Sequence, residues 1–417
     1  MQSPRGTHDI LPSQIAAWHK LETAFEEIAS LYGYQEIRTP IFEQTEVFVR
    51  AIGEHTDVVG KEMYTFPDKG GDSMTLRPEM TASVIRAAIQ HKLLAENPLQ
   101  RLWYAGELFR YERPQAGRYR QFHQFGVECI GATTPEADVE VILLAVALLN
   151  RIGIHEYKLE LNTLASKEVR QMYREELVKF LQDNKEKLSP DSQVRLEKNP
   201  LRVLDSKNPN DKIVVIDAPT IHDFLDEVCQ QHFDTVKTLL TAENIEFTIQ
   251  PRLVRGLDYY SHTVFEFVSS ALGSQSSILG GGRYNDMFVE FGAKPTGAVG
   301  FAMGIERLIM IMEQLQPDLY QAPKPKVMLV TLDRESLQYA QSIAQTLRQA
   351  GISTVADLQR RSLKAQMREA DRLGAHIAVI IGENERQNGK AVVKNMQTGE
   401  QQECAVGDVA AAVTGWL

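Results

Sequence analysis

The stretch Leu108-Phe-Arg-Tyr-Glu-Arg-Pro-Gln-Ala-Gly-Arg-Tyr-Arg-Gln-Phe-His-Gln-Phe-Gly-Val-Glu-Cys-Ile130 decides the fold of the larger part of this chain. Pro114 to Gly117 supplies turn residues near its centre, and each flank has the alternating polar pattern of a half-exposed strand. The flanks are therefore expected to form a long antiparallel hairpin. We expect this hairpin to belong to an antiparallel sheet that has one polar, working face.

One face of the hairpin is rich in functional groups, because alternate residues of a strand share a face. The face comprises Arg110 and Glu112 from one arm and Phe122, Gln124, Gly126 and Glu128 from the other. An exposed polar strand surface would account for this pattern, but a buried core face would not, since it seldom leaves carboxylates unpartnered. Arg118 and Arg120 in the turn favour a site for an anionic ligand.

A second charged segment, Thr75-Leu-Arg-Pro-Glu-Met-Thr-Ala82, lies at a predicted strand-to-helix junction. Arg77, Glu79 and Thr81 alternate along it. The segment alone is a weak signal, because Arg77 and Glu79 also fit a surface ion pair worth less than about 1 kcal/mol.

A third segment, Leu253 to Phe267, places Arg255 beside Gly256 just before a regular strand. Glycine permits a backbone conformation or close approach that other residues cannot adopt. A cation held there could stabilise charge that develops on a phosphate. A strand entry with an ordinary arginine–aspartate pair fits this stretch equally well.

Two glycine-rich stretches follow, Ile278 to Asp286 and Thr296 to Met310. The pattern G-x-x-x-x-G-K-[ST] is absent, which excludes a P-loop nucleotide site. The second stretch predicts a strand that leads into a helix, with Arg307 in the first turn, where a cation and free backbone N–H groups could hold polyphosphate. A surface pair of Glu306 with Arg307 is the alternative.

Length and composition limit the class of protein. The 417 residues are enough for two or three domains, and 43% apolar with 24% charged residues excludes disorder as the main state. The longest apolar run, Val141 to Leu149, is shorter than the roughly 20 residues that cross a bilayer. The three cysteines are widely spaced, which indicates neither a disulfide framework nor a zinc site. We therefore expect a cytoplasmic protein without a membrane segment.

The net charge of −10 is unevenly distributed. Residues 324–417 hold 12 Lys and Arg against 10 Asp and Glu, a net charge of +2, which leaves −12 for residues 1–323. A proline-rich stretch from Pro317 to Lys326 marks the boundary. Beyond it, strand and helix patterns alternate, which predicts a small α/β domain over residues 324–417.

Two features remain outside this division. Residues from about 166 to 247 are helical, charged and rich in loops, which suggests an insertion into the sheet domain. In the tail, a basic stripe on one helix face comprises Arg361, Lys364, Arg368 and Arg372. Such stripes are usually solvated faces, but in the one non-acidic domain nucleic-acid contact becomes a competing interpretation.

Taken in order, these segments resemble the histidyl-tRNA synthetase family of the class II aminoacyl-tRNA synthetases. Four segments resemble the opening of the family and its motifs 1, 2 and 3: Pro4-Arg-Gly-Thr-His-Asp-Ile-Leu-Pro12, Gly33-Tyr-Gln-Glu-Ile-Arg-Thr-Pro40, Phe109-Arg-Tyr-Glu112 with its loop, and Gly300 to Arg307. The segments specific to histidine are Arg255-Gly-Leu-Asp-Tyr-Tyr260 and Gly281-Gly-Arg-Tyr284. Asn285 departs from the acid that the family usually shows.

The resemblance implies an α+β catalytic domain built on an antiparallel sheet over residues 1–323, with a helical insertion at about 166–247. It also implies a C-terminal α/β anticodon-binding domain over 324–417, and a homodimer formed through motif 1. The implied substrates are L-histidine, ATP and histidine tRNA.

For ATP, the resemblance implies that Arg110 and Arg307 grip the α- and γ-phosphates, with Glu112 in the same site. Phe122 would stack on adenine, and Arg118 would assist at the γ-phosphate. Mg²⁺ ions would neutralise the bent triphosphate, and no side chain is assigned as a metal ligand.

For histidine, the resemblance implies that the α-amino group is held by Glu79, Thr81 and Gln124. The imidazole would be surrounded by Glu128, Tyr260 and Tyr284, with Tyr259 in the same substrate site. A neutral imidazole has one N–H donor and one acceptor, so a carboxylate and a phenol can read both nitrogens. Sites of this kind reject look-alikes by about 10⁴ to 10⁵, so no editing domain is required.

The implied reaction has two steps, neither of which needs a protein nucleophile. The histidine carboxylate attacks the α-phosphorus to give histidyl-adenylate and pyrophosphate, and the 3′-terminal ribose hydroxyl of the tRNA then accepts the histidyl group. Arg255 is the expected catalytic cation, together with Arg110 and Arg307. Gln115 would reach the acceptor end of the tRNA, and Arg361 and Lys364 would contact the tRNA from the tail.

One rival belongs to another functional class: a catalytically silent paralogue that regulates ATP phosphoribosyltransferase in histidine biosynthesis. Such a regulator binds histidine without making adenylate, typically lacks the anticodon domain and loses parts of the arginine set. This chain retains Arg110, Arg255 and Arg307 and also has the tail.

Overall fold

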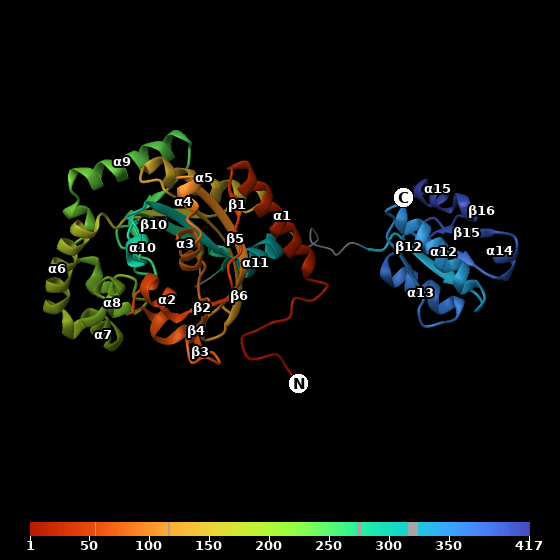
Figure 1. The fold of residues 1–417 in the computed structure, drawn as a ribbon, viewed down its shortest axis with the longest axis horizontal. Helices are drawn as coiled ribbons and strands as arrows, with labels where there is room; N and C mark the ends of the chain where they lie inside the picture. Colours follow the sequence, from red (N-terminus) through yellow and green to blue (C-terminus); the bar gives the residue numbers. More distant parts are fainter. Residues whose placement is uncertain (55, 116, 273–276, 316–323) are drawn as a thin grey trace. The chain divides into compact units, whose positions relative to one another are not determined.

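The predicted hairpin is confirmed in the computed structural model, where β5 (Gln100–Phe109) and β6 (Gln121–Ile130) pair antiparallel (Figure 1). The structure describes residues 1–54, 56–115, 117–272, 277–315 and 324–417. The chain divides into two compact units, 1–321 and 322–417. The stretch from Pro317 to Pro323 within the predicted linker lies outside the described residues.

The hairpin forms the second and third strands of the main sheet of the first unit, whose strand order is β1-β5-β6-β11-β10-β9-β7-β8. The other strands are β1 (Gln35–Glu36), β7 (Lys158–Thr163), β8 (Thr248–Ile249), β9 (Ser261–Val268), β10 (Ser277–Arg283) and β11 (Ala298–Gly304). All neighbours pair antiparallel except β1 with β5 and β7 with β8. The predicted α+β fold on an antiparallel sheet is therefore confirmed.

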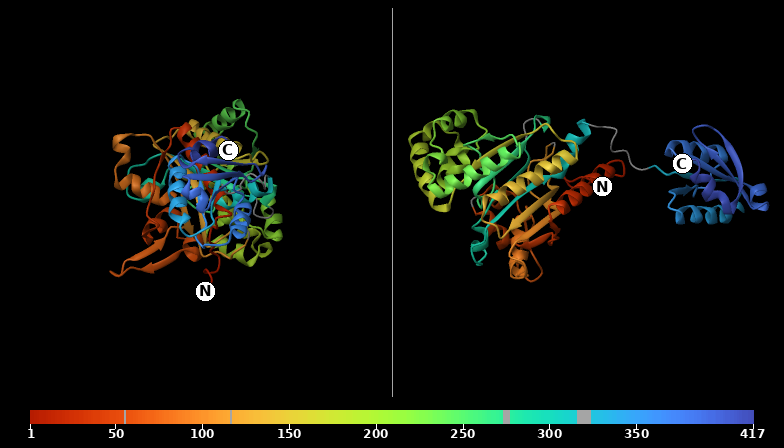
Figure 2. Two further views of the ribbon diagram at one scale, coloured as in Figure 1. Left: turned by 90° about the vertical axis from the view of Figure 1, so that its right-hand side faces the viewer. Right: turned by 90° about the horizontal axis from the view of Figure 1, so that it is seen from above.

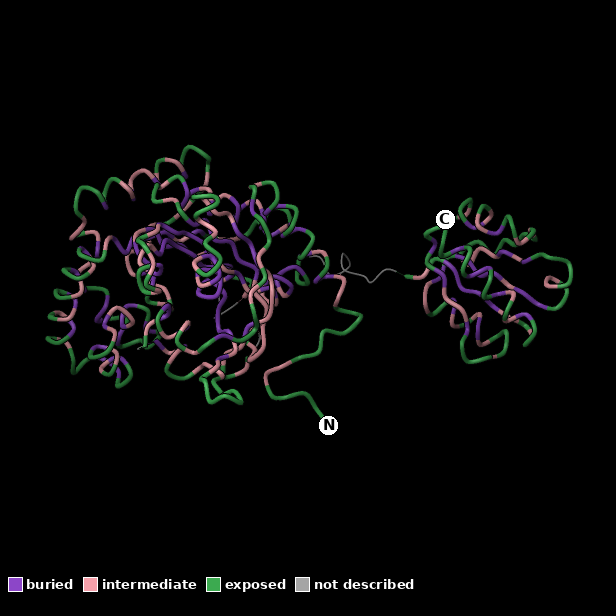
Figure 3. The backbone as a smooth tube through the Cα atoms, in the orientation of Figure 1, coloured by how far each residue is buried: buried purple, intermediate pink, exposed green. Residues whose placement is uncertain are grey.

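One face of this sheet packs against a helical layer, and its strands are buried (Figure 3). The layer consists of α1 (Ile15–Leu31), α5 (Pro135–Arg151), α9 (Glu227–Ala242) and α11 (Ile305–Leu315), of which α1 contacts α5 and α5 contacts α9 (Figure 2). Phe125 and Val127 of β6 point into this core. Since alternate residues point to opposite faces, Gln124 and Glu128 face the other way, as the sequence predicts.

The opposite face is covered only in part. Its second apolar cluster includes Tyr104, Val264 and Tyr284 from the sheet and side chains from the short helices. These helices are α2 (Thr45–Ile52), α3 (Thr81–Gln90), α4 (Leu93–Glu96) and α10 (Met287–Glu290), and a small sheet β2-β4-β3 lies beside them, with β2 (Phe42–Gln44), β3 (Tyr64–Pro67) and β4 (Ser73–Leu76). The polar face of the hairpin therefore opens between these elements.

The region predicted as an insertion is helical, and all of its residues are described. Its helices are α6 (Lys167–Asp183), α7 (Pro190–Lys198) and α8 (Pro209–Ile216), followed by α9, and a 3-10 turn, η3 (Pro200–Val203), follows α7. No strand occurs between β7 and β8. The helices α6 to α8 enclose an apolar core of their own, whereas Phe233, Val236 and Leu240 of α9 belong to the core of the main sheet.

The second unit is the predicted α/β domain. Its sheet has the order β13-β12-β14-β15-β16, with the first three strands parallel and the last two antiparallel. The elements are β12 (Val327–Thr331), α12 (Ser336–Gln349), β13 (Thr354–Ala356), α13 (Leu363–Leu373), β14 (Ile377–Ile381), α14 (Glu383–Gln387), β15 (Lys390–Asn395), β16 (Gln401–Ala405) and α15 (Val409–Thr414). None of the helices in the described part of the chain is long and apolar enough to cross a bilayer.

Candidate functional site

A buried carboxylate, Glu128, lies at the base of the candidate site. Its oxygens accept hydrogen bonds from the hydroxyl groups of Thr81 (2.7 Å), Tyr104 (3.1 Å) and Tyr284. Burial raises the pKa of Glu128 to about 8, although the three hydroxyl groups oppose the shift. The carboxyl group is thus fixed in position and can gain or lose a proton near neutral pH.

Glu79 joins this carboxylate through Thr81. The two oxygens of Glu79 accept hydrogen bonds from the backbone N–H groups of Thr81 and Ala82, each at 2.8 Å, at the start of α3. Burial raises the pKa of Glu79, against the effect of these hydrogen bonds. Thr81 therefore bonds Glu79 with its N–H and Glu128 with its hydroxyl, which brings together three residues predicted to bind histidine.

Three tyrosines, Tyr259, Tyr260 and Tyr284, lie together beside Glu128 and form one corner of the site with it. The ring centroid of Tyr259 lies 4.6 Å from that of Tyr260 and 5.5 Å from that of Tyr284. Burial raises the phenol pKa of all three above the usual value of 10, so each keeps its proton. Each hydroxyl can donate one hydrogen bond and accept others, as an imidazole requires of its surroundings.

Tyr104 is a residue of this site that the sequence interpretation missed. It faces Gly126 across the hairpin, and a Cβ at position 126 would overlap the Tyr104 ring. Only glycine therefore lets the phenol reach Glu128. The signal in the sequence was a glycine in the middle of a polar strand face, which marks the close approach of another group.

Two more strand glycines leave space for functional side chains. A Cβ at Gly300 on β11 would overlap the carboxylate of Glu128, and a Cβ at Gly280 on β10 would overlap the guanidinium of Arg255. Both glycines face the sheet surface on which the site lies. The glycine-rich stretches therefore serve close packing here and do not form a phosphate-cradling loop.

Arg255 is held over the sheet by one carboxylate. Its Nη1 lies 3.1 Å from Oε1 of Glu266 on β9. Its Nε is buried and has no hydrogen-bond partner within the described residues. The guanidinium is therefore fixed in place while part of its donor capacity stays open to a ligand. The alternative of an ordinary pair with Asp258 is wrong for this side chain, since its carboxylate partner is Glu266.

The residues predicted to bind ATP cluster at the loop end of the hairpin. Arg110 Nε donates to the carbonyl of Pro78 at 2.8 Å, and its guanidinium carbon lies 5.4 Å from the centroid of the Phe122 ring. Glu112 lies between two cations, 2.7 Å from Arg118 Nε and 3.9 Å from Arg110 Nη1. A planar ring, one carboxylate and two guanidinium groups are thus brought together.

Arg307, in the first turn of α11, reaches back to the hairpin loop. Its Nη1 donates to the carbonyl of Ser277 at 2.7 Å and its Nε to the carbonyl of Gly117 at 3.2 Å. Burial lowers the pKa of Arg307, and the positive charge of Arg118 adds to this effect. The alternative surface pair with Glu306 is wrong, because Glu306 accepts hydrogen bonds from the backbone N–H of His123 and contacts its Nδ1.

Two glutamines complete the predicted set in the first unit. Gln124 is half-buried on β6, on the same face as Phe122 and Glu128, and its side chain forms no hydrogen bond within the described residues. Gln115 is exposed in the hairpin loop, where its backbone pairs with that of Arg118. Gln124 therefore lies with the residues predicted to bind the substrate histidine, and Gln115 lies beside the arginine cluster.

Arg77 holds parts of the backbone together through hydrogen bonds to backbone carbonyl groups. It is buried, and its Nε donates to the carbonyl of Glu107 and its Nη1 to the carbonyl of Thr39, each at 2.8 Å. It thereby ties the segment before β2 to β5. The alternative of a surface pair with Glu79 is wrong, since Glu79 bonds the start of α3 instead.

In the second unit, the basic stripe is partly neutralised, and the prediction that Arg361 lies on the helix face is wrong, because Arg361 precedes α13. Arg361 lies 2.5 Å from Asp357 and 3.5 Å from Glu369, and Glu369 also pairs with Arg372. Lys364 is exposed on α13 and forms no ion pair within the described residues. Of the two predicted tRNA contacts of the tail, Lys364 is therefore the cation that is open to a polyanion.

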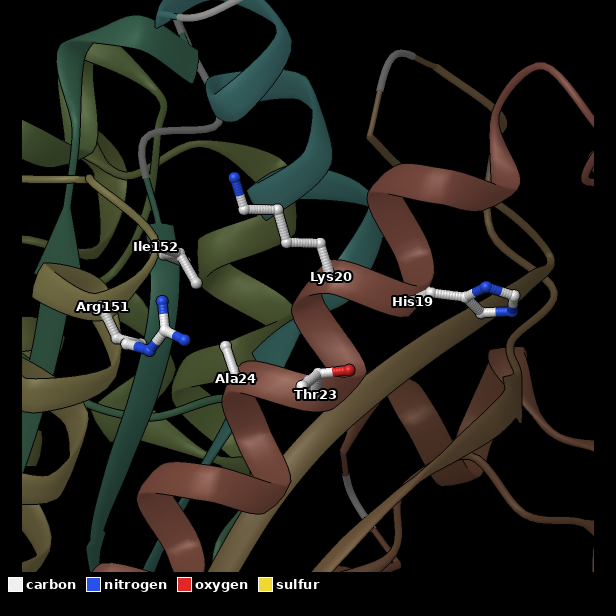
Figure 4. A pocket seen from close by; sticks show the side chains of 6 residues that line it. All are labelled: His19, Lys20, Thr23, Ala24, Arg151 and Ile152. Carbon is white, nitrogen blue, oxygen red and sulfur yellow. The ribbon is translucent and has the colours of Figure 1, made fainter. Parts of the chain in front are cut away.

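Two of the cavities that the described residues of the first unit form bear on where the site lies. A cavity of about 290 Å³ is lined by Arg170, Arg202, Arg255, Asp258 and Tyr260, among others, and so adjoins the candidate site. A shallow pocket of about 310 Å³ lies between α1 and the end of α5, lined by His19, Lys20, Thr23, Ala24, Arg151 and Ile152 (Figure 4). The second pocket contains none of the predicted site residues.

Comparison with known proteins agrees with this geometry. A family model described as histidyl-tRNA synthetase matches residues 6–308, and one described as anticodon binding domain matches residues 326–416. A curated relative, the histidine–tRNA ligase of Chloroherpeton thalassium, is 49% identical over 413 residues, which cover 98% of this chain and 96% of the relative.

Solved structures give the same result. Apo histidyl-tRNA synthetase of S. aureus is 38% identical with a TM-score of 0.83, and the match covers 99% of both chains. A Bacillus halodurans protein, described as an ATP phosphoribosyltransferase regulatory subunit/histidyl-tRNA synthetase, shares the fold at 21% identity and a TM-score of 0.65, over 91% of this chain and 98% of that one. With both family models matched in order, the chain belongs to the histidyl-tRNA synthetase family.

Proposed function

We propose that this chain ligates L-histidine to the 3′ end of histidine tRNA, with ATP as the second substrate and histidyl-adenylate as the intermediate. The observation that carries the proposal is the corner formed by Glu128 and three tyrosines, next to Arg110, Arg255 and Arg307. A carboxylate and phenols suit an imidazole, and guanidinium groups suit a triphosphate. Histidine-dependent ATP–pyrophosphate exchange, followed by charging of histidine tRNA, tests it.

In the first step, Glu79, Thr81 and Gln124 hold the α-amino group of histidine, and Glu128 with Tyr259, Tyr260 and Tyr284 surrounds the imidazole. The histidine carboxylate then attacks the α-phosphorus of ATP in line, a P–O bond forms, and pyrophosphate leaves with the electrons of the broken bond. Arg255, with unsatisfied donor capacity, stabilises the negative charge at the α-phosphate. The protein supplies position and charge, and no covalent protein intermediate is needed.

On the ATP side, Arg110 grips the α-phosphate, Arg307 and Arg118 hold the γ-phosphate, and adenine stacks on Phe122. Glu112 keeps Arg118 and Arg110 in place through its two oxygens. Arg307 is buried beside the positive charge of Arg118, which lowers its pKa, so an incoming polyanion relieves repulsion between the two guanidinium groups.

Mg²⁺ fits the donor set of this site. Glu112 and Glu266 are carboxylates beside the arginines assigned to the phosphates, and no group of three or more potential metal-ligating residues occurs in the described part of the chain. Mg²⁺ is usually held by one or two carboxylates together with substrate phosphates. When bound, it would neutralise charge on the triphosphate.

In the second step, the 3′-terminal ribose hydroxyl of the tRNA attacks the carbonyl carbon of the adenylate, and AMP leaves. We assign residues 1–323 to catalysis, with the insertion at about 166–247, and residues 324–417 to anticodon binding. The compact units 1–321 and 322–417 and the family match to 326–416 support this division. Exposed Gln115 would meet the acceptor end, and Lys364 and Arg361 would contact the tRNA from the tail.

The chain is further proposed to act as a cytoplasmic homodimer. Exposed apolar side chains flank motif 1, namely Leu31, Ile41 and Phe42, which supports burial against a second copy. The three cysteines are free, as expected in a reducing compartment. Sedimentation equilibrium tests the dimer: a monomer at micromolar concentration would contradict it.

The regulatory alternative is not favoured. The chain has the anticodon-binding domain, and its three phosphate-facing arginines are all present. A regulator would bind histidine but give no exchange of label between pyrophosphate and ATP. The same exchange assay therefore separates the two functions.

A further inference from the structure

The segment from Leu253 to Tyr260 carries Arg255 and two of the substrate-binding tyrosines, yet it has no regular secondary structure. It runs between β8 and β9 and forms no strand or helix of its own. Regular backbone pairing therefore cannot fix its position. Other groups must hold it, because a misplacement of about 1 Å can cost about 10²-fold in rate.

The insertion supplies these groups at both ends of the segment. Arg202, on the 3-10 turn η3, donates from Nη1 to the backbone carbonyl of Arg255 at 3.1 Å. Arg170, on α6, donates to the backbone carbonyl of Tyr260. Between them, Asn199 donates from Nδ2 to both carboxylate oxygens of Asp258, at 2.8 and 2.9 Å.

The catalytic body holds other parts of the segment. Asn162 on β7 donates from Nδ2 to the carbonyl of Leu253 at 3.0 Å, and the N–H of Asp258 donates to the carbonyl of Ile52 at 3.3 Å. Among the contacts of the described residues, the carbonyl groups of Arg255 and Tyr260 are thus the two in the segment that receive charged donors, and both donors come from the insertion. Hydrogen bonds from an ionised donor are about twice as strong as neutral ones.

We propose that Arg202 and Arg170 are positioning residues for histidine activation. Arg202 sets the place of the Arg255 guanidinium over Gly280, and Arg170 sets the place of the Tyr260 phenol in the imidazole corner. The inference deepens the proposed function and rests on it. It gives the insertion a part in the chemistry of amino-acid activation, before any tRNA is bound.

The test measures histidine-dependent pyrophosphate exchange without tRNA. For Arg202→Ala we expect kcat to fall about 10- to 100-fold with the KM for histidine within about threefold, because the catalytic cation is displaced. For Arg170→Ala we expect the KM for histidine to rise at least about tenfold with a smaller change in kcat, because a phenol that reads the imidazole is displaced. Arg202→Lys should recover most of the kcat.

Lys198→Ala is the matched control. Lys198 lines the same cavity of about 290 Å³, but its side chain makes no hydrogen bond or ion pair within the described residues. It should leave both constants near those of the wild type. An effect of Lys198→Ala as large as that of Arg202→Ala would mean that only the positive charge of the cavity matters, and it would overturn the proposal.

A double-mutant cycle decides whether Arg202 acts through Arg255. In the Arg255→Ala background, Arg202→Ala should cost little further activity, whereas two independent effects would multiply. Multiplying effects would overturn the proposal. If Arg202→Ala does not fold, as judged by thermal unfolding, Arg202→Met retains the packing of the stem and carries the same test. Absence of exchange in the wild type would instead contradict the proposed function.

Discussion

The ring of Tyr104 occupies the volume that Gly126, its partner across the β5–β6 hairpin, leaves empty. Through this space its hydroxyl reaches Glu128. Gly126→Ala should force the ring away and raise the KM for histidine in pyrophosphate exchange at least about tenfold, because every 1.4 kcal/mol of lost binding is tenfold. Gly60→Ala is the control, since a Cβ there would meet nothing within 4 Å. An unchanged KM in Gly126→Ala would contradict the close packing.

Removal of the Tyr104 hydroxyl alone is a milder change. Tyr104→Phe keeps the ring over Gly126 but takes one of three donors from the Glu128 carboxylate. Glu128 keeps its proton near neutral pH, and a hydrogen bond between neutral groups contributes about 0.5 to 1.5 kcal/mol, so the KM for histidine should rise by about 2- to 10-fold with little change in the KM for ATP. Kinetics with each substrate in turn check this; equal changes in both constants would argue against a role at the imidazole.

The raised pKa of Glu128 should make the stability of the folded chain depend on pH. Its pKa of about 8 in the folded chain lies above the ordinary 4.5, so between these values the folded state keeps a proton that the unfolded state has released. The contribution to stability is present below about pH 4.5 and is lost as the pH rises towards 8. The melting temperature of the histidine-free protein should therefore fall more steeply between pH 5 and 8 in the wild type than in Glu128→Gln. Parallel curves for the two proteins would rule this out.

Arg255 is expected to carry much of the rate of adenylate formation. Arg255→Ala, and equally Arg255→His, should lower pyrophosphate exchange by at least about 10²-fold, the cost of losing one preorganised charge that stabilises the transition state. Folding should be nearly intact, since within the described residues the side chain has one ion pair, to Glu266. Near-normal exchange in a folded variant would remove Arg255 from the catalytic role.

Two neighbouring cations of the tail, Lys364 and Arg361, are expected to contribute unequally to tRNA binding. Lys364→Ala should weaken tRNA binding and reduce the salt slope of the affinity by about one, because each phosphate contact releases about one counterion. Arg361→Ala should do less, since Asp357 and Glu369 already neutralise its guanidinium. Filter binding over a range of salt concentrations measures both. If neither substitution changes affinity or slope, the stripe is a solvated face.

The sequence is sufficient to predict which face of a strand each side chain lies on, because this depends only on alternation along the strand. The register of β6 follows from its two-residue period, so the pattern by itself separates Phe125 and Val127 on the core face from Gln124 and Glu128 on the polar face. The same reliance on local periodicity explains why the tail is predictable as a strand–helix alternation. Local patterns of this kind need no knowledge of distant partners.

The sequence is insufficient where distant segments meet. No spacing predicts that Arg202 donates to the carbonyl of Arg255, 53 residues along the chain. The neutralisation of Arg361 is also invisible to the helical pattern, because Asp357 and Arg361 both precede α13. Such contacts depend on the packing of separate elements, which a single sequence does not reveal.

The division of core residues along α9 bears on how the chain could be shortened or could have grown. Phe233, Val236 and Leu240 pack into the main sheet domain, and His232 bonds Asp138 of α5 at 2.7 Å. Excision of residues 166–247 as a block would open the main core, whereas a junction that joins Ala165 to Asp226 would spare it. Residues 167–224 should accordingly behave as a separate cooperative unit, with faster amide hydrogen exchange than α9.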